Sequence, residues 1–158
     1  ISSPDGDGPL EMPVGNDPDG DVAPQLAELA EGDEIRLSGP FGSDYYEGEP
    51  RPILLAGGPG IGPAIGIAER AVADGHDPVI VYQDDDPIHE DRLDKLRSKG
   101  VSVSVLDSDI SMEDTVAEAT AEGGQVFMYG FAAFLDDATV ALEAAGVETD
   151  DAKVENFG

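Results

Sequence analysis

A continuous apolar run followed at once by a glycine-rich turn constrains the fold of this chain more than any other feature. The run Ile53-Leu54-Leu55-Ala56 is typical of a strand buried on both faces. The turn Gly57-Gly58-Pro59-Gly60-Ile61-Gly62-Pro63 follows it directly, and apolar residues then recur at helical spacing up to Gly75. A strand, a glycine turn and a helix in this order predict an α/β unit with its turn at the carboxyl end of the strand.

Strands and helices continue to alternate up to the end of the sequence. Further strands are expected over 79–82, 101–105, 125–129 and 152–157, and helices over 91–99, 111–121 and 134–146. Ser111 to Asp114 resembles a capping box at the start of the second of these helices. The alternation predicts an α/β fold in which residues 51–158 form a five-stranded parallel, doubly wound domain.

Residues 1–50 have a different composition, rich in Gly, Pro and Asp. Short strands are expected over Leu10–Val14 and Glu34–Leu37, a helix over Pro24–Ala30 and a turn over 39–42. These pieces are too few and too short for an independent core. The sequence opens with Ile1 rather than Met, so we expect an N-terminal piece to be missing.

The charge balance is extreme, because eight basic residues accompany 35 acidic ones for a net charge of −27. Such a surface repels nucleic acid and anionic lipid. No apolar run approaches the roughly 18 residues of a spanning helix, and no secretory signal is visible. We therefore expect no nucleic-acid partner, no membrane insertion and a cytoplasmic location. The acidity favours a halophilic protein, whose self-repulsion salt screens, over an acidic docking face for a basic partner.

Residue types that hold metals or react as thiolates are scarce. The chain has no cysteine and two histidines, and no metal-ligand cluster is visible. We expect no metal site, and we predict that His76 and His89 are ordinary surface residues in loops.

The glycine turn is the strongest candidate for a binding site. Glycines let the backbone approach a phosphate closely, and the following helix offers free N–H groups and its positive dipole end. The turn is therefore predicted to hold a pyrophosphate; the alternative is a tight turn without a ligand. Its spacing is not that of the GxGxxG fingerprint, and no Walker lysine follows.

Four motifs in order give the chain a resemblance to a known family. The turn resembles the GGxGIxP motif of the ferredoxin–NADP reductase-like flavoproteins. The other three motifs, each similar to a segment of that family, are Gly32–Ile35 with Gly39–Gly42, Phe127–Phe131 and Val154–Gly158. The resemblance implies an enzyme that passes hydride between NAD(P)H and FAD, and electrons onward to a partner such as a ferredoxin.

The resemblance also implies where the flavin is held. Residues 1–50 would be the last part of an antiparallel flavin-binding β-barrel, whose first strands precede Ile1. Ser2 and Ser3 would continue the stretch that cradles the flavin. Gly20, Val22 and Ala23 would correspond to the segment that binds the flavin phosphate, although Ala23 lacks the usual hydroxyl. The alternative for these three residues is a plain junction between a loop and a helix.

Further site residues follow from the resemblance at the nicotinamide end. The resemblance implies cofactor contacts from a set of residues that includes Gly58, Pro59, Gly60, Ile61, Asp84, Tyr129, Gly130, Phe131 and Phe157. Tyr129 would stack on or hydrogen-bond to the nicotinamide, or be a core aromatic, and Glu155 would assist hydride or proton traffic. Phe157 would pack near the flavin or simply close the sheet. A carboxylate at Asp84 would repel a 2′-phosphate and accept ribose hydroxyls, which favours NADH.

Two other functions stay open at this stage. The chain could be a non-catalytic NAD(H)-binding subunit that needs a separate flavin-binding polypeptide. It could also be an unrelated α/β ligand-binding domain of the receiver type. The receiver type would need an acidic cluster at the end of the first strand, where this sequence has glycines.

Overall fold

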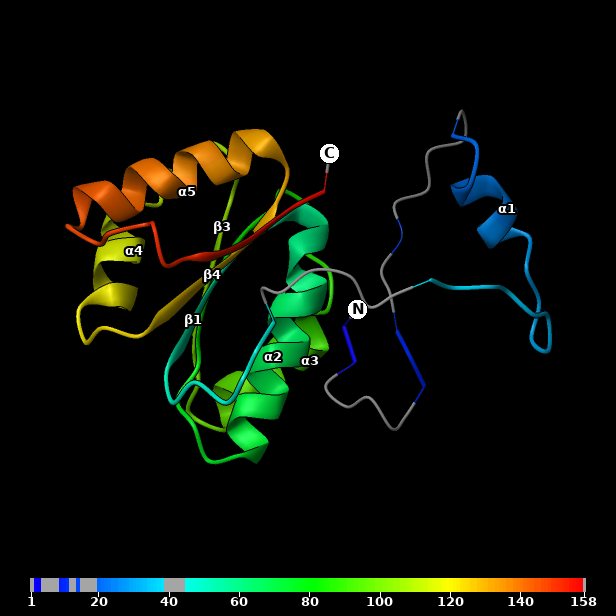
Figure 1. Ribbon diagram of the computed structural model, residues 1–158, viewed down its shortest axis with the longest axis horizontal. Helices are drawn as coiled ribbons and strands as arrows, with labels where there is room; N and C mark the ends of the chain where they lie inside the picture. The colour runs from blue at the N-terminus through cyan, green and yellow to red at the C-terminus, as the bar shows by residue number, and fades with distance from the viewer. Residues whose placement is uncertain (1, 4–8, 12–13, 15–19, 39–44, 158) are drawn as a thin grey trace.

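A five-stranded, all-parallel sheet with helices on both faces forms the body of the molecule (Figure 1). The computed structural model describes residues 2–3, 9–11, 14, 20–38 and 45–157. The strands are β1 (Pro52–Gly57), β2 (Val79–Gln83), β3 (Ser102–Leu106), β4 (Gln125–Gly130) and β5 (Lys153–Asn156), in the order β3-β2-β1-β4-β5. The predicted parallel, doubly wound sheet is confirmed.

Four helices cover the two faces of this sheet. Helices α2 (Ile61–Ala73) and α3 (Glu90–Ser98) pack on one face, and α4 (Glu113–Thr120) and α5 (Ala132–Ala144) pack on the other. A single 3₁₀ turn, η1 (Gly58–Gly60), joins β1 to α2. Glycines with positive φ follow three of these helices, at Gly75, Gly100 and Gly146, as helix ends commonly require.

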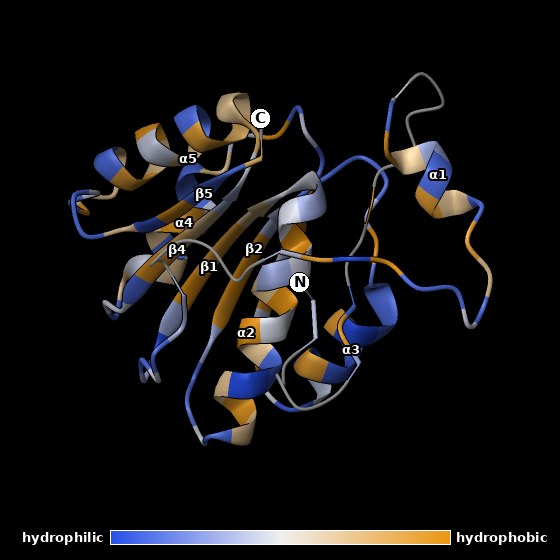
Figure 2. Cartoon of the chain, turned by 45° about the vertical axis from the view of Figure 1, so that its right-hand side comes forward, coloured by the Kyte–Doolittle hydropathy of each residue, from blue (hydrophilic) through white to orange (hydrophobic). Residues whose placement is uncertain are grey.

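The central strands are apolar because both of their faces are covered. All six residues of β1 are buried, with Leu54 and Ala56 facing α2 and α3, and Ile53 and Leu55 facing α4 and α5. Figure 2 shows the hydrophobic residues concentrated in the central strands and on the inner sides of the helices. The continuous apolar run from residue 53 is thus a strand with no solvent face.

The start of α4 differs from the sequence prediction. The helix begins at Glu113 with Met112 as its N-cap, and no side chain caps it. Ser111 lies one residue earlier, where its hydroxyl accepts a long 3.4 Å hydrogen bond from the Glu113 N–H. The predicted capping box is therefore wrong. Met112 is 3% exposed, so its burial in the core sets the point at which the chain enters the helix.

The predictions for the first fifty residues hold only in part. Helix α1 (Ala23–Ala27) forms, but it is shorter than predicted and buries no residue. The strand predicted over Glu34–Leu37 is wrong, because these residues are exposed and none is in a strand. Alternation of polar and apolar residues makes a strand only where a neighbouring strand supplies hydrogen bonds.

No remnant of a barrel is visible in the described residues that precede β1, since none of them is in a strand. Residues 9–11 and 14 of the strand predicted over Leu10–Val14 are irregular; its other residues, like the predicted turn over 39–42, lie outside the described ranges. The domain boundary near Arg51 stays a prediction.

Two basic side chains attach the linker before β1 to the sheet. Arg51 donates hydrogen bonds to the backbone oxygens of Gly123 and Ala119 and pairs with Asp77 at 2.9 Å. Lys153 of β5 donates to the backbone oxygen of Tyr45 and binds the carboxylates of Glu47 and Glu49 at 3.0 and 2.6 Å. The Lys153 ammonium also lies 5.3 Å from the centre of the Phe127 ring.

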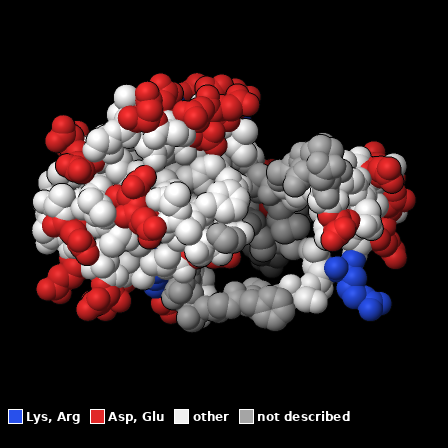
Figure 3. Space-filling view, turned by 90° about the horizontal axis from the view of Figure 1, so that it is seen from above, with Lys and Arg blue, Asp and Glu red and all other residues white. Residues whose placement is uncertain are grey.

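Most charged side chains on the visible surface are carboxylates (Figure 3). Figure 3 shows Asp and Glu side chains spread over the face seen from above, with few Lys or Arg side chains among them. Among the residues that the structure describes, no helix is long and apolar enough to cross a membrane.

Truncating a central strand residue should test the core. Leu54→Ala removes a side chain that is fully buried, so we expect a loss of about 2–5 kcal/mol in the free energy of unfolding. Val140→Ala, at a position that is 56% exposed, should change it by less than about 0.5 kcal/mol. Denaturant titration in molar salt measures both, and equal losses would contradict this account of the core.

Candidate functional site

The carboxyl ends of the strands lie at one edge of the sheet because all five strands are parallel. The glycine turn follows β1 at this edge, Asp84 follows β2, and Phe131 and Phe157 follow β4 and β5. The strand order changes direction between β1 and β4. Ligands of open α/β sheets bind at this kind of switch point, so the candidate site is centred there.

The turn itself is packed tightly against β4. A Cβ atom on Gly60 would lie 2.0 Å from the carbonyl oxygen of Tyr129, so any side chain there would push the turn off the strand. Helix α2 begins at Ile61, directly after η1. Its positive dipole end therefore lies at the candidate site, although the Ile61 N–H already donates to the Gly58 and Pro59 carbonyls and Pro63 has no N–H.

A phenylalanine ring fills the space that two other glycines leave. Cβ atoms on Gly57 and Gly130 would lie 2.4 and 2.6 Å from the Phe134 ring, which comes from the first turn of α5. Packing alone therefore requires glycine at residues 57 and 60. These two glycines would be needed even if the turn bound no ligand, which was the alternative to a pyrophosphate site. Gly58 is different: its φ is +54°, and only the Asp84 Oδ2, at 3.9 Å, would lie near its Cβ.

Asp84 is held in place beside the turn. Its Oδ2 accepts a hydrogen bond from the Tyr82 hydroxyl at 3.0 Å, and its Oδ1 accepts one from the Asp86 N–H at 2.9 Å. Burial, with the nearby Asp84 carboxylate, raises the pKa of Tyr82, so this hydroxyl keeps its proton. A fixed carboxylate acceptor next to Gly58 is suited to ribose hydroxyls.

Two aromatic rings stand at the other side of the switch point. Phe131 is 51% exposed and meets Phe157 edge to face, with ring centres 6.4 Å apart. The Phe157 N–H donates to the Gly130 carbonyl at 3.1 Å, which fixes the chain end beside β4. The structure thus brings Gly130, Phe131 and Phe157 together.

The two residues predicted to be catalytic lie on neighbouring strands in register, but in different surroundings. Tyr129 is 2% exposed and stacks on Phe127, so its ring belongs to the core, the alternative that the sequence left open. Glu155 lies opposite Tyr129 on β5 and is exposed. Their catalytic roles stay predictions.

The residues predicted to bind flavin are not brought to this edge. Ser2 is fully buried against α2, where the Ser2 carbonyl oxygen would lie 3.2 Å from a Cβ on Gly66. The Ser2 hydroxyl donates to a Glu11 carboxylate oxygen at 2.8 Å. The others are Ser3, beside Ser2, and Gly20, Val22 and Ala23 near α1, which Figure 1 shows apart from the sheet. Their contacts with flavin stay predictions.

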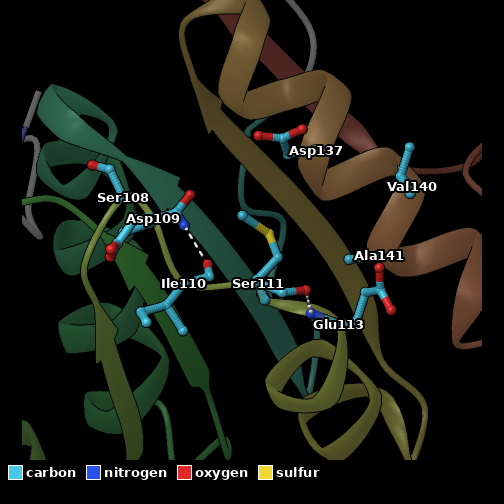
Figure 4. Close-up of a pocket in the computed structure, with 10 residues that line it drawn as sticks. Ser108, Asp109, Ile110, Ser111, Glu113, Asp137, Val140 and Ala141 are labelled. Atoms are coloured by element: carbon cyan, nitrogen blue, oxygen red, sulfur yellow. Dashed lines mark hydrogen bonds between the residues drawn. The ribbon is translucent and has the colours of Figure 1, made fainter.

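A hollow of about 300 Å³ at the same edge was missed by the sequence reasoning (Figure 4). Asp137 and Val140 of α5 line it opposite residues 108–113, which follow β3 and reach the start of α4. Gln83, the last residue of β2, also lines it. Three carboxylates line it, from Asp109, Glu113 and Asp137, and no lining residue is basic. The sequence gave a signal for one side of this hollow, because the polar residues Asp107-Ser108-Asp109 follow the strand predicted over 101–105. The described residues contain no group of three or more acidic or histidine side chains placed to hold a metal ion.

No protein-family model matches the sequence. The fold is similar to that of a cytochrome P450 reductase from Amycolatopsis, with a TM-score of 0.69 and 20% identity over 91% of this chain and 50% of that one. It is also similar to a flavohemoglobin from Malassezia yamatoensis with bound FAD and heme, with a TM-score of 0.62 and 17% identity over 90% of this chain and 42% of that one. A third similar structure is the ferredoxin reductase of a carbazole 1,9a-dioxygenase, with a TM-score of 0.65 and 19% identity over 92% of this chain and 47% of that one.

These likenesses define the class of fold. The resemblance to ferredoxin–NADP reductase-like flavoproteins, predicted from four motifs, is confirmed at the level of the fold over about nine tenths of the chain. The chain spans about half the length of these structures.

A mutant cycle should show that Phe134 dictates the glycine at residue 57. Gly57→Ala places a methyl group inside the ring of Phe134, and we expect a loss of about 1–3 kcal/mol in the free energy of unfolding. In a Phe134→Ala background the same change should cost far less, because the clash is gone. Denaturant titration of the four proteins gives the coupling energy. Strict additivity of the two substitutions would contradict the packing described.

Proposed function

We propose that this chain binds the nicotinamide nucleotide of a ferredoxin–NADP reductase-like flavin oxidoreductase. The observation that carries the proposal is the turn at the switch point, where Gly58 adopts positive φ beside the fixed carboxylate of Asp84. The backbone of the turn and the positive end of the α2 dipole hold the pyrophosphate. Asp84 accepts hydrogen bonds from the ribose hydroxyls.

The acidic surroundings of the site favour NADH over NADPH. Asp85 and Asp86 follow Asp84, and Asp109 and Asp137 line the neighbouring hollow. A 2′-phosphate would bring about −2 further charges close to these carboxylates, with no basic side chain lining the hollow to compensate. The preference is supported by this group of carboxylates, of which Asp84 is one.

The nicotinamide would lie between the turn and the exposed ring of Phe131. When bound, it supplies hydride to a flavin. The side chains of this chain position it: Gly130 lets it approach the backbone, Phe131 and Phe157 offer ring faces, and Glu155 offers an exposed carboxylate nearby. The backbone carbonyl of Tyr129 packs against Gly60 and so supports the turn from the side of β4.

The flavin would be FAD, held by a half of the enzyme to which Ser2, Ser3 and the Gly20–Ala23 segment contribute. The flavohemoglobin with a similar fold has bound FAD and heme, which supports FAD as the flavin. The ferredoxin reductase with a similar fold supports a ferredoxin as the electron partner. The net charge of −27 supports a halophilic, cytoplasmic enzyme whose docking surfaces work in concentrated salt.

A second candidate is a non-catalytic NAD(H)-binding subunit completed by another polypeptide. One observation favours it: none of the described residues before β1 forms a strand. Adding FAD and NADH to the chain in molar salt separates the candidates, because only the oxidoreductase bleaches the flavin.

Nucleotide titration tests the proposal itself. We expect NADH to bind more tightly than NADPH in molar salt, by calorimetry. Gly58→Val should weaken NADH binding at least tenfold, since a β-branched residue strongly disfavours φ near +54°. Asp84→Asn should reduce the difference between the affinities for NADH and NADPH.

Asp150→Asn is the matched control for the change at Asp84. It removes one carboxylate from the exposed loop before β5, at the opposite edge of the sheet. It should leave both affinities unchanged. Failure of NADH to bind, or equal effects of the two Asp→Asn changes on nucleotide affinity, would overturn the proposal.

A further inference from the structure

The loop between β2 and α3, residues 84–88, carries Asp84 and is fastened at its start to the neighbouring strand end. The Asp84 N–H donates to the Leu106 carbonyl at 3.0 Å, and the Asp85 Oδ1 accepts a hydrogen bond from the Ser108 N–H at 2.8 Å. The loop after β2 is therefore tied to the residues that follow β3. A movement of this loop away from the carboxyl edge of the sheet would break these hydrogen bonds.

The far end of the loop is fixed by the start of α3. His89, the N-cap of this helix, has φ +61°, and its carbonyl accepts hydrogen bonds from the N–H groups of Arg92 and Leu93 at 2.9 and 3.0 Å. Leu93 is buried in the core, so this helix start is held in place. The prediction that His89 is an ordinary surface residue is wrong, because its side chain is 19% exposed and its Nε2 lies 3.9 Å from a Glu11 carboxylate oxygen.

One tyrosine hydroxyl connects both parts of this loop to the sheet. The ring of Tyr82 on β2 is fully buried on the face covered by α2 and α3, and its register partner on β1 is Ala56, just before the glycine turn. Its hydroxyl donates to the Asp84 Oδ2 at 3.0 Å and accepts a hydrogen bond from the Ile88 N–H at 3.3 Å. Tyr82 therefore fixes the loop relative to β1 and to the turn that follows it.

The Asp84 carboxylate is held from two sides and can still accept further hydrogen bonds. An ionised carboxylate has about four acceptor positions, two on each oxygen. The Tyr82 hydroxyl takes one position on Oδ2, and the Asp86 N–H takes one on Oδ1. Among the described residues these are the hydrogen bonds of its side chain, so each oxygen keeps capacity for another donor. Two such acceptors suit the two adjacent hydroxyls of an unmodified ribose.

We propose that Tyr82 is a positioning residue that sets the preference for NADH over NADPH by holding the Asp84 carboxylate toward Gly58. This inference rests on the proposed function, and it names the residue that gives Asp84 its direction. A fixed carboxylate accepts both ribose hydroxyls of NADH. A 2′-phosphate removes one of these donors and adds negative charge beside a carboxylate that cannot turn away. Once the carboxylate is free to rotate, the attraction and the repulsion both weaken.

Concentrated salt separates this direct contact from the general acidity of the edge. The Debye length is about 3 Å at 1 M salt, so carboxylates that do not touch the nucleotide are largely screened. A hydrogen bond between Asp84 and the ribose is not lost in this way. The part of the preference that remains in molar salt therefore depends on the direction of the Asp84 carboxylate.

Tyr82→Phe tests the proposal because it removes the hydroxyl without changing any charge. By calorimetry in molar salt, we expect the ratio of NADH affinity to NADPH affinity to fall about three- to tenfold, the range for the loss of one hydrogen bond. In an Asp84→Asn background the same change should move the ratio by less than about twofold, because the carboxylate that Tyr82 orients is gone. A loss of stability alone would weaken both nucleotides equally and would leave the ratio unchanged.

A measurement without nucleotide follows the same loop. In ¹⁵N relaxation, the amides of Asp86 and Ile88 should have order parameters of about 0.85 in the parent protein, and Tyr82→Phe should lower them toward about 0.6. Tyr46→Phe is the matched control, since it also removes a hydroxyl that forms a hydrogen bond, at 2.6 Å with the His76 Nδ1 before β2, at the opposite edge of the sheet. It should leave the order parameters and the affinity ratio unchanged.

The outcomes distinguish this inference from the proposed function. Absence of NADH binding in the parent protein would overturn the proposed function and the nucleotide preference with it. If the parent binds NADH, an unchanged ratio in Tyr82→Phe, or the same fall in the Asp84→Asn background, would overturn the role of Tyr82 alone. Unchanged order parameters would overturn it with no nucleotide present. Circular dichroism of each variant confirms that the sheet is folded.

Discussion

The contact between the glycine turn and β4 is the constraint on which the arrangement of this edge depends. With no Cβ on Gly60, η1 lies directly on the carbonyl of Tyr129, and α2 starts at the next residue. The same closeness lets Phe134 cover Gly57 and Gly130, so α5 is seated over the ends of β1 and β4. Helices on opposite faces of the sheet therefore take their positions from one tight junction between two strands. The candidate site is the solvent side of that junction.

A second constraint is the scarcity of positive charge. With eight basic residues against 35 acidic ones, most carboxylates have no cation available. Three of the basic residues, Arg51, Arg92 and Lys153, each bind several partners, and each connects a segment that precedes β1 to the α/β body. The cations are thus used where chain segments that lack a core of their own must be attached. The remaining carboxylates repel one another across the surface, and only dissolved salt screens them.

Much of the α/β body could be predicted from the sequence, because its signals are local. The run from Ile53 to Ala56 and the glycines after three helices fix elements without reference to distant residues. The strand predicted over Glu34–Leu37 failed for the opposite reason: a strand depends on a partner, and alternation says nothing about one. At the site, the turn and Asp84 were found because each directly follows a strand. The hollow beside α5 was missed because its lining brings together distant residues, although the acidic residues after β3 gave a local signal for one side of it. The position of His89, 3.9 Å from a Glu11 carboxylate oxygen, had no local signal at all.

The packing of Gly57, Gly60 and Gly130 bears on how related sequences should be compared. Selection for a folded sheet alone would keep these three positions glycine, even in a relative that binds no nucleotide. Invariant glycines at these three positions would therefore show that the fold is shared, and would not show that a ligand is bound. Residue 58 is the informative position in such a comparison of sequences. Its surroundings leave room for a side chain, and only its positive φ favours glycine there. Related sequences that keep the other three glycines but replace Gly58 would be those in which the fold is retained and the proposed nucleotide binding is not.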